Sequence, residues 1–434
     1  MLDKITSDEI LLGRRALLDG WGGRPNIIIT KAKGAKLWDS EGKEYIDCTS
    51  QAFSLNIGAN HPKVIETVKK QLEKTTHIAY QLDSVPLLFL TRKLTQIAPV
   101  DLNRVNFCLE GSLASESAMK LAMKNRAGGK YFIAFEHGYH GRNLPTMAAS
   151  WTDPESPFSY FKENVIQVPE AYCYRCKFNL SYPSCNLECA RFLEETIEKE
   201  KDSGIIAVMM EPVQGNGGQI SFPPEFHRKV RKICDRQGIL LIWDEIQTGF
   251  GRVGKMFAAE LYGVVPDILV FGKAVAGGFP LAGIIVRDNL KGFDAGENAF
   301  TFAHFPLSLV AALATVDVLE EGKLLERCNR LNQHIIAHLR NLQEKYEIIG
   351  DVRGPGLAIG IELVKDRDSK EPAAKEANEL VRLALERGVM FGISKYGGLG
   401  NVIKIKPPLV ISDEEVERVL SVFEGCIAEV QRHG

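Results

Sequence analysis

The chain has 434 residues, of which 45% are hydrophobic and 25% are charged, as in an ordinary globular protein. Its 53 basic and 55 acidic residues give a net charge of -2, which provides no electrostatic reason to expect nucleic acid or a membrane surface as a partner. Residues 1–23 lack the apolar core of a signal peptide, and no stretch is apolar enough to span a bilayer, so we expect a cytoplasmic protein.

The N-terminal part contains two strand candidates, at residues 27–40 and 43–53, joined by the turn Ser-Glu-Gly-Lys. We expect residues 1–55 to join residues 330–434 in a smaller α+β domain built from both chain ends. Residues 56–329 would then form the large domain.

The large domain alternates short apolar runs with helical patterns, which favours an α/β fold with a mainly parallel central sheet. The expected strands lie within residues 104–110, 130–136, 205–213, 238–245, 267–273 and 281–287, and the clearest helices within residues 112–126, 189–204 and 224–238. A long helical stretch follows at residues 306–346. The remaining pattern predicts a strand region at 352–364, a helix at 371–388, strands near 389–395 and 401–410, and a final helix.

Four of the nine cysteines, Cys173, Cys176, Cys185 and Cys189, form the pattern C-x2-C-x8-C-x3-C. Thiolate pairs at such spacing can hold a structural zinc ion, and disulfides are a second interpretation. Four reduced thiols in a surface loop are the third. None of these interpretations is catalytic.

Polar or glycine-rich clusters follow five of the expected strands. They are residues 110–117, 137–143, 211–218, 244–251 and the segment from Gly272 to Pro280 that contains Lys273. Ligands of open α/β sheets bind beyond the carboxyl ends of the strands, so these clusters predict one site at that edge.

One chemistry unites these clusters. A lysine in an apolar, glycine-lined pocket has a destabilised ammonium group, so Lys273 is a candidate nucleophile for a Schiff base with an aldehyde. If the aldehyde is pyridoxal 5'-phosphate, its ring nitrogen needs a buried acid, and Asp244 ends a strand. Backbone N–H groups at Gly111 and Ser112 would receive the phosphate at a helix start. Tyr139 would stack on one face of the ring.

The segment from Ile242 to Gly283 resembles the signature of class III (subgroup II) aminotransferases, which are pyridoxal-phosphate enzymes of fold type I. The resemblance extends from Gly-Ala-Asn-His-Pro at residues 58–62 to Pro-Pro-Leu-Val-Ile-Ser at residues 407–412. Its acid pair, GFGR, PDI and GK elements, with 29 positions between Asp244 and Lys273, make the match specific.

The resemblance implies roles for single residues. Lys273 would bind the cofactor and later move the substrate proton, Asp244 would pair with the ring nitrogen, and Gln247 would bond the ring hydroxyl. By the resemblance, Thr301 of a neighbouring subunit would complete the phosphate site, which implies a homodimer or a dimer of dimers. Independently of the resemblance, Ile246 is placed to close the ring face opposite Tyr139.

Two buried acids beside this set, Glu211 and Glu245, are expected to make structural hydrogen bonds rather than to transfer protons.

The chain departs from the family pattern where the substrate is bound. The phosphate loop reads EGSLA instead of SGTEA, so Leu113 replaces the usual acid. Asn216 stands where many members that handle ω-amino acids have Glu, and Lys404 stands where an Arg receives a carboxylate. We expect Lys404 to bind a carboxylate without the bidentate fork of arginine, although a solvated surface cation is the alternative.

Two further residues are substrate candidates. Arg142 stands where 4-aminobutyrate aminotransferases bind the distal carboxylate, and Phe53 either walls the entrance or is an ordinary core aromatic. The predicted function is a ping-pong aminotransferase that acts on an amino acid, an ω-amino acid or a primary amine together with a 2-keto acid.

Three other functions are alternatives to the aminotransferase. An amino-acid racemase or epimerase on the same scaffold is the main alternative. A non-catalytic binding protein would have no reason to keep Lys273, Asp244 and Gln247. A nicotinamide dehydrogenase is disfavoured because no GxGxxG motif opens a helix after the first strand.

Overall fold

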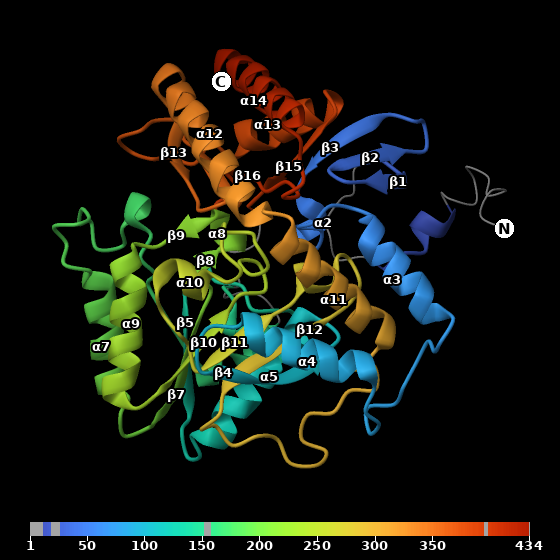
Figure 1. Ribbon diagram of the computed structural model, residues 1–434. Helices are drawn as coiled ribbons and strands as arrows, with labels where there is room; N and C mark the ends of the chain where they lie inside the picture. Colours follow the sequence, from blue (N-terminus) through green and yellow to red (C-terminus); the bar gives the residue numbers. More distant parts are fainter. Residues whose placement is uncertain (1–11, 19–26, 152–157, 395–397, 434) are drawn as a thin grey trace.

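The computed structural model describes residues 12–18, 27–151, 158–394 and 398–433. Two seven-stranded sheets organise these residues, together with a two-stranded hairpin of β8 (Val213–Gln214) and β9 (Ile220–Ser221). One sheet, called the larger sheet below because it belongs to the larger part of the chain, is formed by the middle of the sequence. The other, called the smaller sheet, is formed by both chain ends, which meet above the larger sheet in Figure 1. Among the helices described, none has the length and apolar character needed to cross a membrane.

The larger sheet has the mainly parallel arrangement that the sequence predicts. Its order is β4 (Leu102–Cys108), β12 (Ala282–Arg287), β11 (Ile268–Phe271), β10 (Leu240–Asp244), β7 (Ile205–Met210), β5 (Tyr131–Phe135) and β6 (Val165–Val168). β12 runs antiparallel to both of its neighbours, β4 and β11, and the other neighbouring pairs of the sheet are parallel. All residues of β7 and β11 are buried, which explains their continuous apolar sequences.

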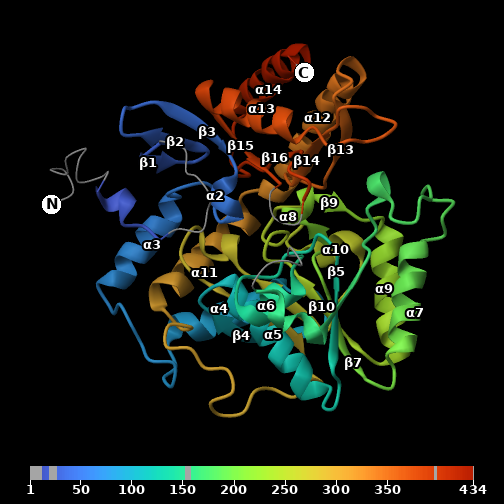
Figure 2. The ribbon, with the colours of Figure 1, turned by 180° about the vertical axis from the view of Figure 1, so that it is seen from behind.

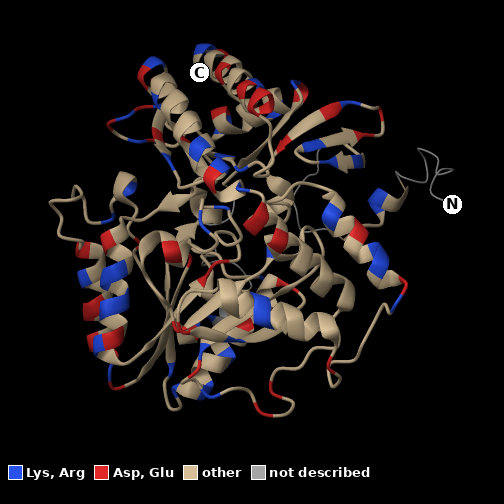
Figure 3. Ribbon diagram, in the orientation of Figure 1, with Lys and Arg blue, Asp and Glu red and all other residues tan. Residues whose placement is uncertain are grey.

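Helices cover this sheet and carry the surface charge. α5 (Gly111–Asn125) packs on β11 and β12, whereas α9 (Pro224–Gln237) packs on β10 and on α7 (Glu188–Lys199). Another group packs together at the side of the sheet: α3 (Pro62–Leu72), α4 (Val85–Ile97) and α11 (Pro306–Glu321). Acidic and basic residues are interspersed along α7 and α9, and the central strands are largely free of charge (Figure 3).

The smaller sheet joins the two ends of the chain. Its order is β1 (Ile29–Lys33), β2 (Lys36–Asp39), β3 (Glu44–Cys48), β15 (Val389–Ile393), β16 (Val402–Ile405), β14 (Ile359–Leu363) and β13 (Ile349–Arg353). The parallel pair of β3 and β15 makes the junction, visible from behind in Figure 2. The helices of this part are α12 (Leu324–Lys345), α13 (Ala374–Glu386) and α14 (Asp413–His433). The expected boundaries at residues 55 and 329 stay predictions.

Three elements differ from the sequence prediction. Residues 27–40 form two antiparallel strands rather than one, because the chain turns at Gly34, whose φ is +59°. The helical stretch 306–346 is broken between α11 and α12 at Lys323, which has a φ of 50°. The strand predicted for residues 43–53 ends at Cys48.

Beyond Cys48 the chain makes a left-handed turn, Ser50–Phe53, whose four φ values are 47°, 45°, 60° and 69°. Left-handed backbone costs about 1–2 kcal/mol per non-glycine residue, so the turn needs outside support. Asp47 supplies it: Oδ1 accepts from Thr49 N at 2.8 Å, and Oδ2 accepts from Gln51 N at 3.0 Å.

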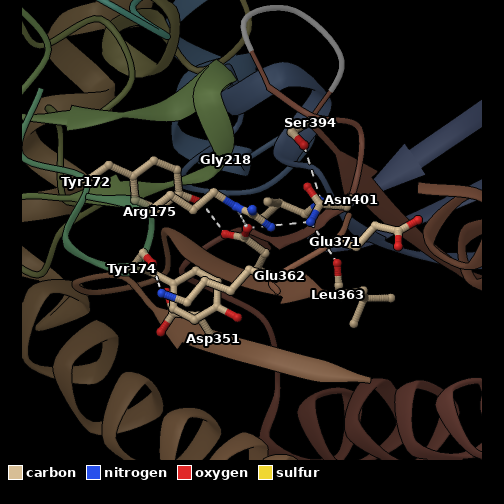
Figure 4. A network of polar contacts seen from close by, with 12 residues as sticks. Tyr172, Tyr174, Arg175, Gly218, Asp351, Glu362, Leu363, Glu371, Ser394 and Asn401 are labelled. Carbon is tan, nitrogen blue, oxygen red and sulfur yellow. Dashed lines mark hydrogen bonds and ion pairs between the residues drawn. The ribbon is translucent and has the colours of Figure 1, made fainter. Parts of the chain in front are cut away.

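A buried polar network joins the smaller sheet to loops of the larger unit (Figure 4). Glu362 on β14, with no exposed surface, accepts hydrogen bonds from Tyr172, Arg175 and Arg353. Arg353 also donates to the carbonyl oxygen of Gly218 at 3.0 Å. Removing one partner of Glu362 would leave a buried charge unpaired, so the network is costly to break. Through the hydrogen bond from Arg353 to Gly218, the network holds the segment around Gly218 against the smaller sheet.

Candidate active site

A cavity of about 160 Å³ lies at the carboxyl edge of the larger sheet, where the sequence predicts a site. The described residues that line it are Glu110, Gly111, Ser112, Tyr139, His140, Gly141, Glu211, Asp244, Ile246, Gln247 and Lys273. All five strand-end clusters therefore contribute to one cavity.

Lys273 follows β11 directly after Gly272 and has a left-handed φ of 47°. Burial lowers the pKa of its ammonium group to about 8, although Asp244 and Glu211 act in the opposite direction. In the part of the chain that the structure describes, Nζ has no hydrogen-bonded or ion-paired partner; it lies 5.3 Å from the ring centroid of Phe53. A pKa of about 8 leaves a larger fraction of this lysine as the unprotonated amine near neutral pH than in an ordinary lysine, and nucleophilic catalysis uses that form.

Asp244 is the last residue of β10, and its carboxylate is buried. Oδ2 lies 2.9 Å from Nδ1 of His140, and Oδ1 accepts from the backbone N–H of Ile246 at 3.1 Å. His140 is a functional candidate that the sequence prediction missed, although its cluster after β5 was recognised. Its Nε2 is buried without a partner among the described residues. The contacts with His140 and Ile246 hold the carboxylate of Asp244 at the cavity wall in a fixed orientation.

Glu211 makes the structural hydrogen bonds expected of it. Its Oε1 accepts from Tyr139 N at 2.9 Å, and its Oε2 accepts from Gly215 N at 3.0 Å. Burial, and secondly the charge of Asp244, raise the pKa of Glu211 to about 7. Glu211 thus connects the loop that carries Tyr139 to the segment that carries Gly215.

Glu245 points away from the cavity and holds the first turn of α10 (Ala258–Tyr262). Its Oε2 accepts from Ala258 N at 2.6 Å, and its Oε1 accepts from Ala259 N at 2.8 Å. Burial raises the pKa of this carboxyl to about 7. The two adjacent acids therefore differ in role: Asp244 faces the cavity, and Glu245 caps a helix.

The N-terminus of α5 opens into the cavity at Gly111 and Ser112. The side chain at the preceding position, Glu110, makes no capping hydrogen bond, which leaves the first backbone N–H groups available to a ligand. A Cβ at Gly111 would lie 3.0 Å from Cδ1 of Ile246, so a side chain there would narrow the cavity. This end of the cavity fits a phosphate group.

Gln247 offers a buried acceptor that no described residue uses. Its Oε1 has no hydrogen-bond partner, and a Cβ built on Gly215 would approach it to 1.9 Å. Glycine at position 215 is therefore required for Gln247 to take this position. An unused acceptor, a buried acid, a lysine and a phosphate cradle around one cavity fit pyridoxal 5'-phosphate.

Four predicted site residues lie outside the cavity lining. Phe53 and Lys404 are buried, with 3% and 6% of their surface exposed. Arg142 is exposed, with its Cζ 5.8 Å from the ring centroid of Tyr139, and Thr301 is exposed on a turn. The roles of all four stay predictions.

Lys404 is placed close to the lysine that lines the cavity. Burial, and secondly the charge of Lys273, lower the pKa of Lys404 to about 8. Asn216 lies on α8 (Gly215–Gly218), which packs on β16, the strand that carries Lys404. Asn216 and Lys404, which both differ from the residues usual in the family, therefore lie on elements that pack against each other.

The four clustered cysteines are free thiols that line one small cavity of about 20 Å³. Within the described ranges, only Glu136, His137 and Glu170 bring three possible metal-binding atoms within 4.8 Å of one another. The arrangement accordingly contains neither disulfides nor a preformed zinc site at Cys173, Cys176, Cys185 and Cys189.

Comparison with known proteins gives consistent results. A family model described as "Aminotransferase class-III" matches residues 19–427. A leucine/methionine racemase of Thermococcus litoralis is 36% identical over 93% of this chain and 91% of its own. A 5-aminovalerate aminotransferase of Pseudomonas putida is 37% identical over 98% and 99%. A crystal structure of a Bacillus anthracis aminotransferase is 28% identical, covers 97% of this chain and 98% of its own, and has a TM-score of 0.90.

Proposed function

Because the chain belongs to the class-III aminotransferase family, whose members use pyridoxal 5'-phosphate, we propose that Lys273, Asp244 and the α5 N-terminus form its catalytic centre. The enzyme is an aminotransferase of fold type I that moves an amino group between a donor and a 2-keto acid. The observation that carries the proposal is Nζ of Lys273, which has no partner among the described residues and lies in the same cavity as the fixed carboxylate of Asp244.

Each residue has a separate task in this proposal. When bound, the cofactor supplies an electron sink for the carbon that carries the amino group. Asp244, oriented by His140, holds the proton on the ring nitrogen, and Gln247 accepts the hydrogen bond of the ring hydroxyl. Gly111 and Ser112 bind the phosphate through backbone N–H groups.

Lys273 is the residue that moves protons. Its Nζ would take the proton from the substrate carbon that carries the amino group and hold it for transfer. A pKa of about 8 matches this task, because a base works best when its pKa lies near the working pH. Tyr139 and Ile246 confine the ring on either side and exclude water from the reacting atoms.

The proposed working form is a cytoplasmic homodimer with its two centres at the interface. The position of Thr301 supports a dimer, because this residue is exposed and does not line the cavity of its own chain, so it is free to reach the centre of a neighbouring subunit. Arg142 and Lys404 are the proposed carboxylate-binding residues for the substrate.

The first experiment is a half-reaction followed by visible spectroscopy. The purified holoenzyme receives a single-enantiomer amino acid without a keto acid, and the cofactor band is recorded. Conversion to the spectrum of the amine form supports an aminotransferase with that donor. If no donor in a panel changes the band, the proposed function is wrong.

Racemisation is the second candidate, because the racemase of Thermococcus litoralis is 36% identical to this chain. Both reactions begin with removal of the same proton by a base such as Lys273. In the same experiment a racemase keeps its band while the donor loses enantiomeric purity. Chiral chromatography of the donor separates the two outcomes.

A further inference from the structure

Three side chains at the carboxyl edge of the larger sheet, outside the cavity lining, bring possible metal-binding atoms together. Glu136, His137 and Glu170 each place one carboxylate oxygen or ring nitrogen within 4.8 Å of the other two. Nδ1 of His137 lies 2.9 Å from Oε1 of Glu170. Nitrogen and oxygen ligands lie about 2.0–2.2 Å from a tetrahedral zinc ion, which puts them about 3.3–3.6 Å apart. Small side-chain movements therefore suffice for the cluster to close on an ion.

The topology of the sheet explains why these residues meet. β5 and β6 are parallel neighbours with Phe135 opposite Val168, so both strands end at the same level. Glu136 and His137 follow β5 directly, and Glu170 is the second residue after β6. A backbone hydrogen bond of 2.9 Å from Glu136 N to Val168 O continues the pairing past the strand ends. The backbone of the sheet thus places all three side chains.

The imidazole of His137 is held in position by its neighbours. Its ring centroid lies 5.3 Å from that of Trp151 and 6.3 Å from that of Tyr172. His137 has a left-handed φ of 59°, a conformation that histidine adopts more often than most residues. Its side chain is 24% exposed, so an ion can reach it from solvent. The ligand is therefore both oriented and accessible.

The two acids of the cluster are shielded from solvent. The side chain of Glu170 is 5% exposed, and that of Glu136 is 16% exposed. Nζ of Lys177 lies 3.2 Å from Oε2 of Glu136, but the lysine side chain is 61% exposed. An ion pair with so exposed a lysine contributes little, and one ammonium group does not balance two carboxylates. The cluster therefore favours a further cation.

A buried acceptor beside Glu136 also lacks a partner. Nε2 of Gln214 donates to the carbonyl oxygen of Glu136 at 2.8 Å. Oε1 of the same amide is buried and has no hydrogen-bond partner among the described residues, although Gln214 is only 1% exposed. Buried polar atoms without partners are uncommon in native proteins. A water molecule bound to a metal ion is a group that would satisfy this oxygen.

The ligand set selects a class of ion. Carboxylates bind many divalent cations, but an imidazole nitrogen favours first-row transition metals over Mg²⁺ and Ca²⁺. The set contains no thiolate, which separates it from the cavity of the four cysteines, although Glu170 lines both places.

We propose that Glu136, His137 and Glu170 bind one divalent first-row transition-metal ion, which ties the ends of β5 and β6 together. The ion is structural: its ligands do not line the cavity and take no part in the reaction. It would hold the segment that leads from His137 to Tyr139 at the cavity wall. The site does not depend on the proposed function.

The test uses Mn²⁺ as the probe, because carboxylate ligands suit this ion and thiolates do not, which keeps the cysteine cavity out of the result. Chelator-treated holoenzyme is titrated with Mn²⁺, and the free ion is measured by electron paramagnetic resonance. We expect one ion per chain, retained in an equal concentration of Mg²⁺. Glu170→Gln and His137→Asn should each weaken binding by about 10-fold or more, because even the outer partners of a metal ligand contribute about 10- to 100-fold.

Lys177→Met distinguishes a metal site from an ordinary ion-paired cluster. It should tighten Mn²⁺ binding by about two- to fivefold, because the ammonium group competes with the ion for Glu136. Lys345→Met is the matched control: this lysine is also paired with a glutamate, is 59% exposed, and should leave Mn²⁺ affinity unchanged. Should His137→Asn or Glu170→Gln fail to fold, Lys177→Met and Glu136→Gln decide the matter.

Three results would overturn the proposal. The wild-type enzyme binds no Mn²⁺ at millimolar concentration, the ligand variants bind Mn²⁺ as tightly as the wild type, or an equal concentration of Mg²⁺ displaces the ion. The last result would identify an acidic surface without preference for a transition metal. Each of these results leaves the half-reaction of the cofactor unaffected, so the proposed function is tested separately.

Discussion

At the scale of the residue, the centre is defined by buried ionisable groups whose charge states are set by their surroundings. Lys273 and Lys404 have pKa values lowered to about 8, whereas Glu211 has a pKa raised to about 7, in each case chiefly because of burial. Such perturbed groups concentrate at functional sites, where their deprotonated or protonated forms are used near neutral pH.

Substitution of Lys273 tests the catalytic assignment. Lys273→Ala should remove the visible band of the bound cofactor and lower the rate of the half-reaction by about 10²- to 10⁴-fold, because the general base is lost. Stopped-flow spectroscopy measures the rate, and far-UV circular dichroism checks the fold. Lys345→Met, far from the cavity on the surface of α12, should leave both the band and the rate unchanged.

Lys404 should make the stability of the apoprotein depend on pH. Its folded pKa of about 8 lies below its ordinary value of 10.5, so the unfolded state binds more protons between these values and stability rises with pH. Lys404→Met should therefore stabilise the apoprotein at pH 7 by about 2–3 kcal/mol, and the gain should disappear as the pH approaches 10.5. Urea unfolding at several pH values measures it; a gain that grows with pH would contradict the assignment.

At the scale of the element, the left-handed turn is the most unusual feature. Ala52 has a φ of 60°, where glycine is unstrained. Ala52→Gly should therefore leave stability unchanged or increase it by up to about 1 kcal/mol, whereas Ala428→Gly within α14 should lower it by about 1 kcal/mol. Thermal unfolding of both variants gives the comparison, and equal losses would show that the turn carries no such strain.

The same turn shows where sequence reasoning stops. Continuous apolar strands such as β7 and the polar clusters at their ends are local patterns, so the sheet edge, Lys273 and Asp244 could be predicted from them, whereas the role of Gln247 was implied only by the family resemblance. The turn could not be predicted, because four successive left-handed residues contradict local propensity and Arg252, which is distant in the sequence, helps to hold them together with the neighbouring Asp47.

At the scale of the whole molecule, subunit exchange tests the proposed interface. Lys273→Ala and Thr301→Ala homodimers should each be weakly active at limiting cofactor. When the two are mixed and allowed to exchange, one centre of each hybrid combines native Lys273 with native Thr301 from the other subunit. Activity should therefore rise after mixing; no rise, with exchange confirmed by mass spectrometry, would place Thr301 outside the neighbouring centre.

The parallel pairing of β3 with β15 has a consequence for synthesis of the protein. β3 leaves the ribosome early, but its partner follows roughly 340 residues later, a delay on the order of 20–70 s at about 5–20 residues per second. During that interval one edge of the three N-terminal strands, β1 to β3, has no native partner and is open to non-native strand pairing. The strands of the larger sheet and all described residues that line the cavity precede β15 in the sequence, so they leave the ribosome before this partner of β3. The hazard of non-native strand pairing at this edge is therefore greatest before β15 has been synthesised.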